Sequence, residues 1–282
     1  MKKKILSAVL AAALAVGALA GCGAAKRNDS KSDGTNARTT LKVAASATPH
    51  AEILEHVKSE LAKEGVDLQV KEFSDYVQPN NVVESGDFDA NYFQHVVYLD
   101  NFNQEKGTHL VDAGKIHYEP FGIYAGTKKQ LSELAEGDTI AVPNDTTNEA
   151  RALLLLQEQG LITLKEGAGI KATVQDITAN PKNLKIQELE AAQVSRVKGE
   201  VAFVVLNGNY AKQAGLDPSK DPIAVEKNDG EAAKNYVNVI AVKDGRQNDE
   251  AIQKLVKILK SDETKKWITE KYGQSVIPYA GQ

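Results

Sequence analysis

The sequence predicts an α/β protein with two lobes, and three patterns support this. A strand, a helix and a second strand are expected in succession between residues 41 and 71, the arrangement of a βαβ unit. A continuous apolar run at 201–206 is typical of a strand covered on both faces. A further strand at 236–242 comes late in the chain. We therefore expect the chain to cross between the lobes twice, near 121–127 and near 236–242.

The first 40 residues are predicted to be a leader and a tether. Three lysines precede an apolar run at 5–20, which ends in Leu-Ala-Gly-Cys at residues 19–22. This pattern is a secretory signal, and the run is too short for a membrane span. The ending resembles the lipobox of bacterial lipoproteins, which implies a signal peptide at 1–21 and acylation, for example by palmitate, at Cys22. The polar residues 24–40 are a flexible tether within 22–40. The alternative is a secreted protein with an unmodified cysteine.

Composition limits the classes of function. The chain has 34 Lys and Arg against 38 Asp and Glu, for a net charge of −4, and Cys22 is its one cysteine. A mildly acidic exported protein is not expected to bind nucleic acid or to hold a basic membrane-binding face. Attachment to the membrane would then come from the lipid alone.

The elements of the first part of the chain follow from local patterns. After a strand at 41–46, Thr48-Pro49 offers an N-cap and a first-turn proline, and Gly65 ends the apolar stripe of the helix that follows. Alternation at 66–71 predicts a strand with one exposed face. Also expected are a short helix ending near residue 86, a strand at 88–90, a helix at 95–106, and strands at 110–111 and 116–125.

The second part contains more strands than helices. Thr146 and Glu149 have the spacing of a capping box, which predicts a helix that begins at residue 146 and runs to 160. Strands are expected at 138–142, 173–177, 184–189, 201–206 and 236–242, and two helices at 252–259 and 263–272. These elements divide into a first lobe at 41–125 and 239–282 and a second lobe at 126–238.

Residues 86–100 hold an unusual density of aromatic side chains. Four aromatic residues and one histidine fall within eleven positions: Phe88, Tyr92, Phe93, His95 and Tyr98. One interpretation is a hydrophobic core beneath a sheet. The other is a small-molecule pocket, in which the aromatics supply area while Asn91, Gln94 and His95 supply directed polar groups.

The predicted helix start at 146 is a candidate anion site. Its free amides and dipole favour a negative charge. Asn148 and Arg151 are three residues apart and share a face of the first turns. Arginine is suited to gripping a carboxylate with two parallel hydrogen bonds. The alternative is a surface arginine paired with Glu149 or Asp145.

Two asparagines stand at informative positions. Asn207 follows a buried strand at its carboxyl end, where open α/β sheets bind ligands. Asn238 lies within a predicted strand, where asparagine is disfavoured, so it is either an edge residue or a ligand contact. The side-chain oxygens of both could accept from an ammonium group.

Signals for catalysis are weak. The chain has neither Gly-x-Ser-x-Gly nor His-Glu-x-x-His, and its five histidines lack the spacing of a zinc site. We therefore expect no enzymatic activity, no cofactor and no bound metal.

Several ordered motifs resemble one family. They are Asp-Tyr-Val-Gln-Pro-Asn at 75–80, Asp-Ala-Asn-Tyr-Phe-Gln-His at 89–95, Ala-Val-Pro-Asn-Asp at 141–145, Asn-Leu-Lys-Ile at 183–186, Asn-Gly-Asn-Tyr-Ala at 207–211 and Tyr-Val-Asn at 236–238. Together they are similar to the methionine-binding lipoproteins of ABC importers, the MetQ/NlpA family. The resemblance covers residues 41–282 and agrees with the lipobox.

The resemblance implies a two-lobe periplasmic-binding-protein-like fold of type II with a ligand cleft between the lobes. The resemblance implies a pocket for the ligand side chain, which is lined by Tyr76, Phe93, His95 and Tyr98. It implies that Asn148 and Arg151 hold the ligand carboxylate and that Asn207 and Asn238 hold the amino group. The implied partners are methionine, an ABC permease and its ATPase subunit. The implied location is the extracytoplasmic face of the cell membrane, through the lipid anchor.

Alternatives remain open at this level. Within the class, the ligand could be L-methionine, D-methionine, a methionine-containing dipeptide or another small amino acid. Outside the class, the candidates are a hydrolase or lyase acting on a sulfur amino acid and a surface adhesin with a vestigial cleft.

Overall fold

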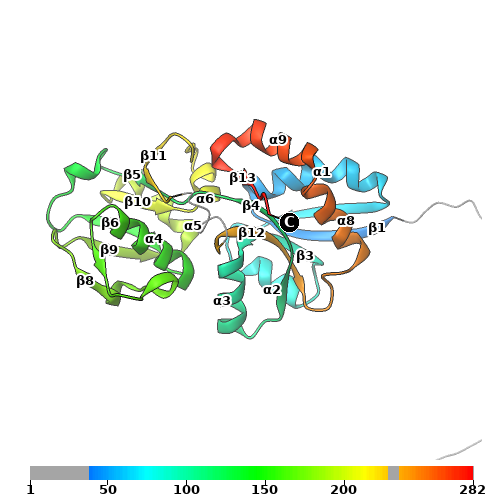
Figure 1. The fold of residues 1–282 in the computed structure, drawn as a ribbon, viewed down its shortest axis with the longest axis horizontal. Helices are drawn as coiled ribbons and strands as arrows, with labels where there is room; N and C mark the ends of the chain where they lie inside the picture. Colours follow the sequence, from blue (N-terminus) through cyan, green and yellow to red (C-terminus); the bar gives the residue numbers. More distant parts are fainter. Residues whose placement is uncertain (1–37, 228–234, 282) are drawn as a thin grey trace, which may run out of the picture. The chain divides into compact units, whose positions relative to one another are not determined.

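The computed structural model describes residues 38–227 and 235–281, which form two α/β lobes, each built on its own sheet (Figure 1). The signal peptide, Cys22 and the tether up to residue 37 lie outside the described residues. No helix among the described residues is long and apolar enough to cross a membrane.

The first sheet has six strands in the order β13-β4-β12-β3-β1-β2. The strands are β1 (Thr39–Ala45), β2 (Val66–Glu72), β3 (Ala90–His95), β4 (Leu110–Tyr118), β12 (Val237–Lys243) and β13 (Ile277–Pro278). β1 pairs parallel with β2 and β3, whereas β12 runs antiparallel to β3 and β4. The late return strand thus inserts between two strands formed much earlier in the chain.

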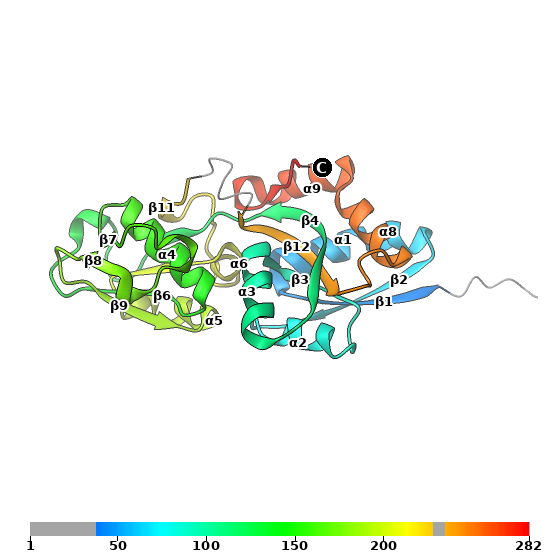
Figure 2. The same cartoon turned by 60° about the horizontal axis from the view of Figure 1, so that its bottom comes forward.

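Helices cover both faces of this sheet (Figure 2). They are α1 (Glu52–Lys63), α8 (Glu250–Leu259) and α9 (Asp262–Tyr272) on one face, and α2 (Gln78–Glu84) and α3 (Val96–Lys106) on the other. Strand β12 shows why two apolar faces are needed. Ile240 and Val242 pack into the core under α1 and α8, while Val239 and Ala241 pack with Leu99 of α3. This is the two-residue alternation of a strand buried on both sides.

The second sheet has five strands in the order β11-β5-β10-β6-β9. The strands are β5 (Gly122–Ala125), β6 (Thr139–Pro143), β9 (Lys185–Leu189), β10 (Phe203–Leu206) and β11 (Pro222–Val225). Helix α4 (Thr146–Glu158) packs on one face with Phe203 and Val205, and α5 (Ala191–Val194) and α6 (Gly208–Gln213) lie with Val204 and Leu206 on the other.

Short elements complete the chain. Strands β7 (Thr163–Leu164) and β8 (Ile177–Ala179) form a two-stranded sheet. Single-turn helices span Ala47–Ala51, Leu131–Glu133, Gly169–Lys171, Val174–Asp176, Ser195–Gly199 and Gly273–Ser275.

The two-lobe α/β prediction is confirmed, but the sheets shift the expected lobe boundaries. Strand β5 pairs with β10 and β11, so Gly122–Ala125 belongs to the second sheet although it was expected in the first lobe. Val237 and Asn238 pair with β4, so they belong to the first sheet. The first crossing is therefore residues 119–121, and the second lies between β11 and β12.

Two strand predictions were wrong in detail. The strand expected at 88–90 is β3, at Ala90–His95, and all of its residues are buried. The polar side chains of β3 hide the pattern expected of a buried strand. They are hydrogen-bonded inside the lobe, since Asn80 donates to Gln94 Oε1 at 2.9 Å and Asn91 donates to Asn80 Oδ1 at 2.8 Å. The strand expected at 173–177 is mostly a 3-10 turn, because Thr173 and Asp176 form a capping box.

Helix α4 begins at Thr146 as predicted, but its cap differs from the predicted capping box. The N-cap is Asp145, which accepts from the Asn148 backbone N–H, and the Thr146 hydroxyl instead donates to Glu105 at 2.7 Å. Glu149 does not reach back to the N-cap but accepts from the Val174 N–H at 3.0 Å. An aspartate one residue earlier competes successfully because its short carboxylate fits the N-cap geometry.

Candidate functional site

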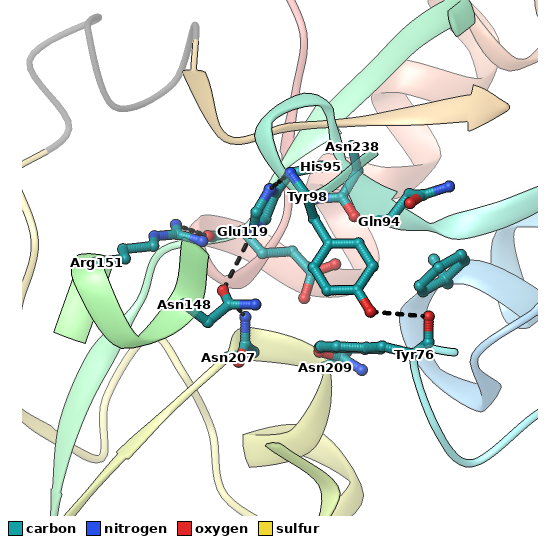
Figure 3. Close-up of a pocket in the computed structure, with 11 residues that line it drawn as sticks. Tyr76, Gln94, His95, Tyr98, Glu119, Asn148, Arg151, Asn207, Asn209 and Asn238 are labelled. Carbon is teal, nitrogen blue, oxygen red and sulfur yellow. Dashed lines mark hydrogen bonds between the residues drawn. The ribbon is translucent and has the colours of Figure 1, made fainter. Parts of the chain in front are cut away.

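A cavity between the two sheets is lined by side chains from both lobes (Figure 3). It is lined by Tyr76, Phe93, Gln94, His95, Tyr98, Glu119, Asn148, Arg151, Asn207, Asn209 and Asn238. All eight ligand-binding candidates predicted from the sequence are in this set. The free space is about 20 Å³, which holds little more than one water molecule. An amino acid can enter only if the walls separate.

The cavity has an aromatic side. Tyr76 lies 5.6 Å from Phe93 and 5.7 Å from Tyr98, measured between ring centroids, and the Tyr98 hydroxyl donates to the Tyr76 carbonyl at 3.1 Å. Figure 3 places Tyr76 and Arg151 on opposite sides of the cavity. The aromatic stretch therefore serves both expected purposes: Phe93 and Tyr98 line the cavity, while Tyr92 is fully buried in the first core.

Arg151 is a buried cation on α4. Its Nε donates to Glu226 Oε2 at 2.9 Å, and its Nη2 donates to Glu226 Oε1 and to the Glu119 carbonyl, the latter at 3.0 Å. Burial alone would lower the pKa of the guanidinium, but the Glu226 carboxylate raises it above its ordinary value. The alternative of a surface arginine is wrong, and its acidic partner is neither Glu149 nor Asp145.

Most of the hydrogen-bonding capacity of Asn148 is used by the protein itself. Its Nδ2 donates to both carboxylate oxygens of Asp145, at 2.9 and 3.0 Å, and its Oδ1 accepts from Asn207 Nδ2 at 2.8 Å and from His95 Nε2 at 3.2 Å. An amide has two donors and one oxygen with two lone pairs. The two Asp145 oxygens lie too close together to take one N–H each, so they share one N–H of Asn148. Asn148 thus orients Asn207 and His95 and keeps its second N–H without a partner among the described residues.

Two amide atoms in the cavity wall are without a partner among the described residues. They are Asn207 Oδ1, an acceptor, and Asn209 Nδ2, a donor. The orientation of Asn209 is set by Tyr76, whose hydroxyl donates to Asn209 Oδ1 at 2.5 Å. Buried polar atoms are nearly always paired, so these two atoms are prepared for a bound molecule.

Asn238 differs from Asn207 in this respect. Its Oδ1 lies 2.9 Å from His50 Nε2. Because an amide oxygen can only accept, Nε2 of His50 carries the proton, and His50 Nδ1 accepts from the Ser46 hydroxyl at 2.7 Å. The Nδ2 group of Asn238 is left for other partners. One lone pair of the Asn238 oxygen is therefore already used, whereas Asn207 Oδ1 has no partner among the described residues.

Glu119 is the anion of the cavity and lies in the first crossing. Its Oε1 is 2.9 Å from His117 Nε2 and 3.3 Å from His50 Nε2. His117 Nδ1 in turn accepts from the Tyr92 hydroxyl. Gly208 opens α6 against this carboxylate, where a Cβ would stand 2.8 Å from Glu119 Oε2. The absence of a side chain lets the helix approach.

Burial dominates the titration of these groups. It lowers the pKa of His50 to about 4 and those of His95 and His117 to about 3. It raises the pKa of Glu119, although His50 and Arg151 act in the opposite direction. The three histidines are therefore neutral at pH 7, and each acts as a fixed donor and acceptor.

The same cluster is the one group of metal-ligand type among the described residues. One atom each of His50, His117 and Glu119 lie within 4.8 Å of one another. Their facing atoms are already joined by hydrogen bonds, which orient Glu119 and Asn238 toward the cavity.

Glu119 and Asn209 line the cavity although they were not predicted as site residues, and Gln94 was expected only as one of the polar groups of the aromatic stretch. Asn209 stands two residues after Asn207, in the motif at 207–211, and that signal could have found it. No sequence motif around Glu119 indicates a binding residue, because its position in the cavity wall depends on where the chain crosses between the sheets.

The arrangement defines a class: two α/β lobes enclosing a small polar and aromatic cavity form a periplasmic-binding-protein-like fold. The chain belongs to the NlpA lipoprotein family, whose model matches residues 41–280. The family prediction from the sequence motifs is confirmed.

Relatives and solved structures agree with this family. The chain is 39% identical over 286 residues to the methionine-binding lipoprotein MetQ of Bacillus subtilis, covering 99% of each chain. It is 70% identical to a protein of Ruminococcus gnavus whose crystal structure matches with a TM-score of 0.84, covering 86% of this chain and 99% of that one. A nutrient-binding protein from Burkholderia cenocepacia bound to methionine is 45% identical, with a TM-score of 0.79, and covers 84% and 99%.

Proposed function

We propose that this protein is the methionine-binding subunit of an ABC importer, with L-methionine held in the cavity between the lobes. The observation that carries the proposal is the cavity wall: aromatic rings stand opposite a buried arginine, and unpartnered amide atoms face the space between them. The methionine bound by the Burkholderia cenocepacia relative supports the choice of ligand.

Each end of the ligand has a complementary group. The ligand carboxylate binds the Nη1 side of Arg151 and the Nδ2 group of Asn238. The ammonium group binds Asn207 Oδ1 and the Glu119 carboxylate. This assignment moves Asn238 from the amino-group site expected earlier to the carboxylate site, because His50 already donates to its oxygen. The thioether lies among Tyr76, Phe93 and Tyr98, since sulfur packs well against ring edges.

The magnitudes are compatible with tight binding. Methionine has about nine non-hydrogen atoms, and the best small ligands gain roughly 1.5 kcal/mol per atom, which permits nanomolar affinity. Both charged ends must be paired when they are buried, because an unpaired buried ion costs several kcal/mol. We therefore expect Arg151→Ala to weaken binding far more than the loss of any one aromatic ring, as measured by calorimetric titration.

The decisive experiment is a thermal-shift panel on the body without its leader and Cys22, after unfolding and refolding to remove bound ligand. L-methionine, D-methionine, Gly-Met and other amino acids are compared. A ligand at a thousand times its dissociation constant adds about 4 kcal/mol of stability. A large shift confined to methionine-like compounds is expected, and the strongest one names the ligand. Equal, negligible shifts across the panel would exclude methionine as the ligand.

The lipid anchor and the transport partners belong to the same proposal. Cys22 is acylated, the protein stays on the extracytoplasmic face of the membrane, and it passes its ligand to a permease driven by an ATPase. The Cys22→Ser variant is expected to lose palmitate labelling and to leave the membrane fraction. The protein does no chemistry on its ligand, so methionine recovered after prolonged incubation should be unchanged, whereas a hydrolase or lyase would yield products.

A further inference from the structure

Glu226 lies just after β11, at the start of the second crossing, and it is fastened to the first crossing. Its backbone N–H donates to the Phe121 carbonyl at 3.0 Å, and its Oε1 accepts from the Phe121 N–H at 3.0 Å. The Tyr118 hydroxyl also donates to Oε1. Both ends of the residue are held, so the position of its carboxylate is determined by the crossings.

This carboxylate occupies one edge of Arg151. The guanidinium has five N–H donors. The donor of Nε and the two of Nη2 are used by Glu226 and by the Glu119 carbonyl. Arg151 lines the cavity, whereas Glu226 is not among the described residues that line it. A ligand carboxylate therefore has the Nη1 side of Arg151 available to it.

The aromatic surroundings make the charge balance important. The guanidinium carbon lies 4.1 Å from the ring centre of Tyr236 and 4.8 Å from that of Phe121. The side chains of Arg151 and Glu226 are 4% and 10% exposed. A buried arginine among rings needs a counter-ion, and Glu226 supplies one whether or not a ligand is bound.

We propose that Glu226 is an internal counter-ion that limits the affinity of the cavity for a carboxylate ligand. The inference rests on the proposed function, in which Arg151 receives the ligand carboxylate. Two carboxylates on one guanidinium repel each other, and the repulsion is large where water is excluded. Because Arg151 is already neutralised, the ligand gains less from binding to it. The pair thus stabilises the folded protein while restricting how tightly the ligand is held.

A charge series at this position tests the inference. Glu226→Gln keeps an oxygen for Tyr118 and Phe121 but removes the charge, and Glu226→Asp keeps the charge but draws it back from Arg151. We expect the affinity for L-methionine to rise at least fivefold in the Gln variant and about twofold in the Asp variant. The Gln variant should also unfold at lower urea concentration than the wild type when no methionine is present. Glu166→Gln removes one negative charge at an exposed position, and it should alter neither the affinity for L-methionine nor the urea concentration at which the protein unfolds.

A second ligand separates charge from positioning. L-methioninol lacks the carboxylate, so its affinity should be the same in the wild type and the Gln variant. Binding that is too weak to measure in both proteins also agrees with this expectation. Weaker or unchanged binding of L-methionine in the Gln variant would overturn the inference, as would an equal gain for methioninol. If the Gln variant does not fold, the direction of the change in the Asp variant decides. A wild type that does not bind methionine would instead refute the proposed function.

Discussion

At the scale of single residues, the amide groups of the cavity differ in what each can still bind. The oxygen and one N–H of Asn148 are engaged, Asn207 presents an oxygen, and Asn209 presents an N–H group. Donor and acceptor positions around a small ligand are therefore set by neighbouring side chains, in particular His50, which fixes Asn238. Under the proposed function, recognition would depend on this outer layer as much as on the residues that touch the ligand.

Asn148→Ala tests the outer layer. The change leaves the N–H groups of Asn207 and His95 without an acceptor, and each buried unpaired group costs about 1–3 kcal/mol. We expect the free energy of unfolding in urea to fall by about 2–3 kcal/mol, and methionine to bind at least tenfold more weakly by calorimetry. Asn81→Ala, at an exposed position of α2, is the matched control and should change stability by less than about 0.5 kcal/mol. Wild-type affinity in Asn148→Ala would show that Asn207 is oriented without it.

At the scale of elements, the cap of α4 and two of the proposed binding groups lie within the first two turns of the helix. Asp145 caps the helix through the Asn148 N–H and holds the Asn148 side chain with the same carboxylate. Arg151 follows three residues later, about one turn further on, on the buried side of the helix. The helix start thus positions Asn148 directly and Arg151 through the register of the helix.

The identity of the cap is testable by urea unfolding. Asp145→Ala removes the acceptor of the first turn, and we expect a loss of about 1–2 kcal/mol in the free energy of unfolding. Thr146→Ala removes only an exposed hydrogen bond to Glu105, so the expected loss is below about 0.5 kcal/mol. Equal losses in the two variants would mean that both residues contribute to the cap.

At the scale of the whole molecule, acid should unfold the protein through its buried histidines. The pKa of His50 is about 4 and those of His95 and His117 about 3, below the ordinary value near 6.5. Since the folded state binds these protons less readily than the unfolded chain, stability is lost as pH falls below 6.5 toward the folded values. Each histidine contributes a slope of roughly 1.4 kcal/mol per pH unit within that window.

Buried acids act in the opposite direction. Burial raises the pKa of Glu119, of Asp145 and, to about 6, of Glu149, so these groups add stability as pH falls through their raised values. Their effect fades below pH 5, where the unfolded carboxyls also take up protons. We therefore expect the urea midpoint to fall between pH 5 and pH 4. His109→Gln, at an exposed position, should leave that change as it is. A midpoint that stays constant over this interval would mean that the three histidines are already protonated in the folded protein.

The alternation of strands and helices could be predicted from sequence patterns, and the family resemblance pointed to eight residues that line the cavity. Hydrophobic periodicity and the residues that start or stop a helix are local signals. Helices α1 and α4 and the apolar strand β10 could therefore be predicted from adjacent residues. The motifs around 89–95 and 207–211 pointed to residues that line the cavity, because each motif keeps these side chains close together in the chain.

How these residues share their hydrogen bonds depends on the three-dimensional fold. Glu119 enters the cavity because the chain crosses between sheets there, and Glu226 reaches Arg151, 75 residues away in sequence, because Glu226 is held beside Phe121 of the first crossing. His50 and Asn238 are 188 residues apart, yet their contact decides which atom of the amide faces the ligand. Long-range pairing leaves no periodic trace in a sequence, since a polar side chain has the same local pattern whether its partner is water, protein or ligand.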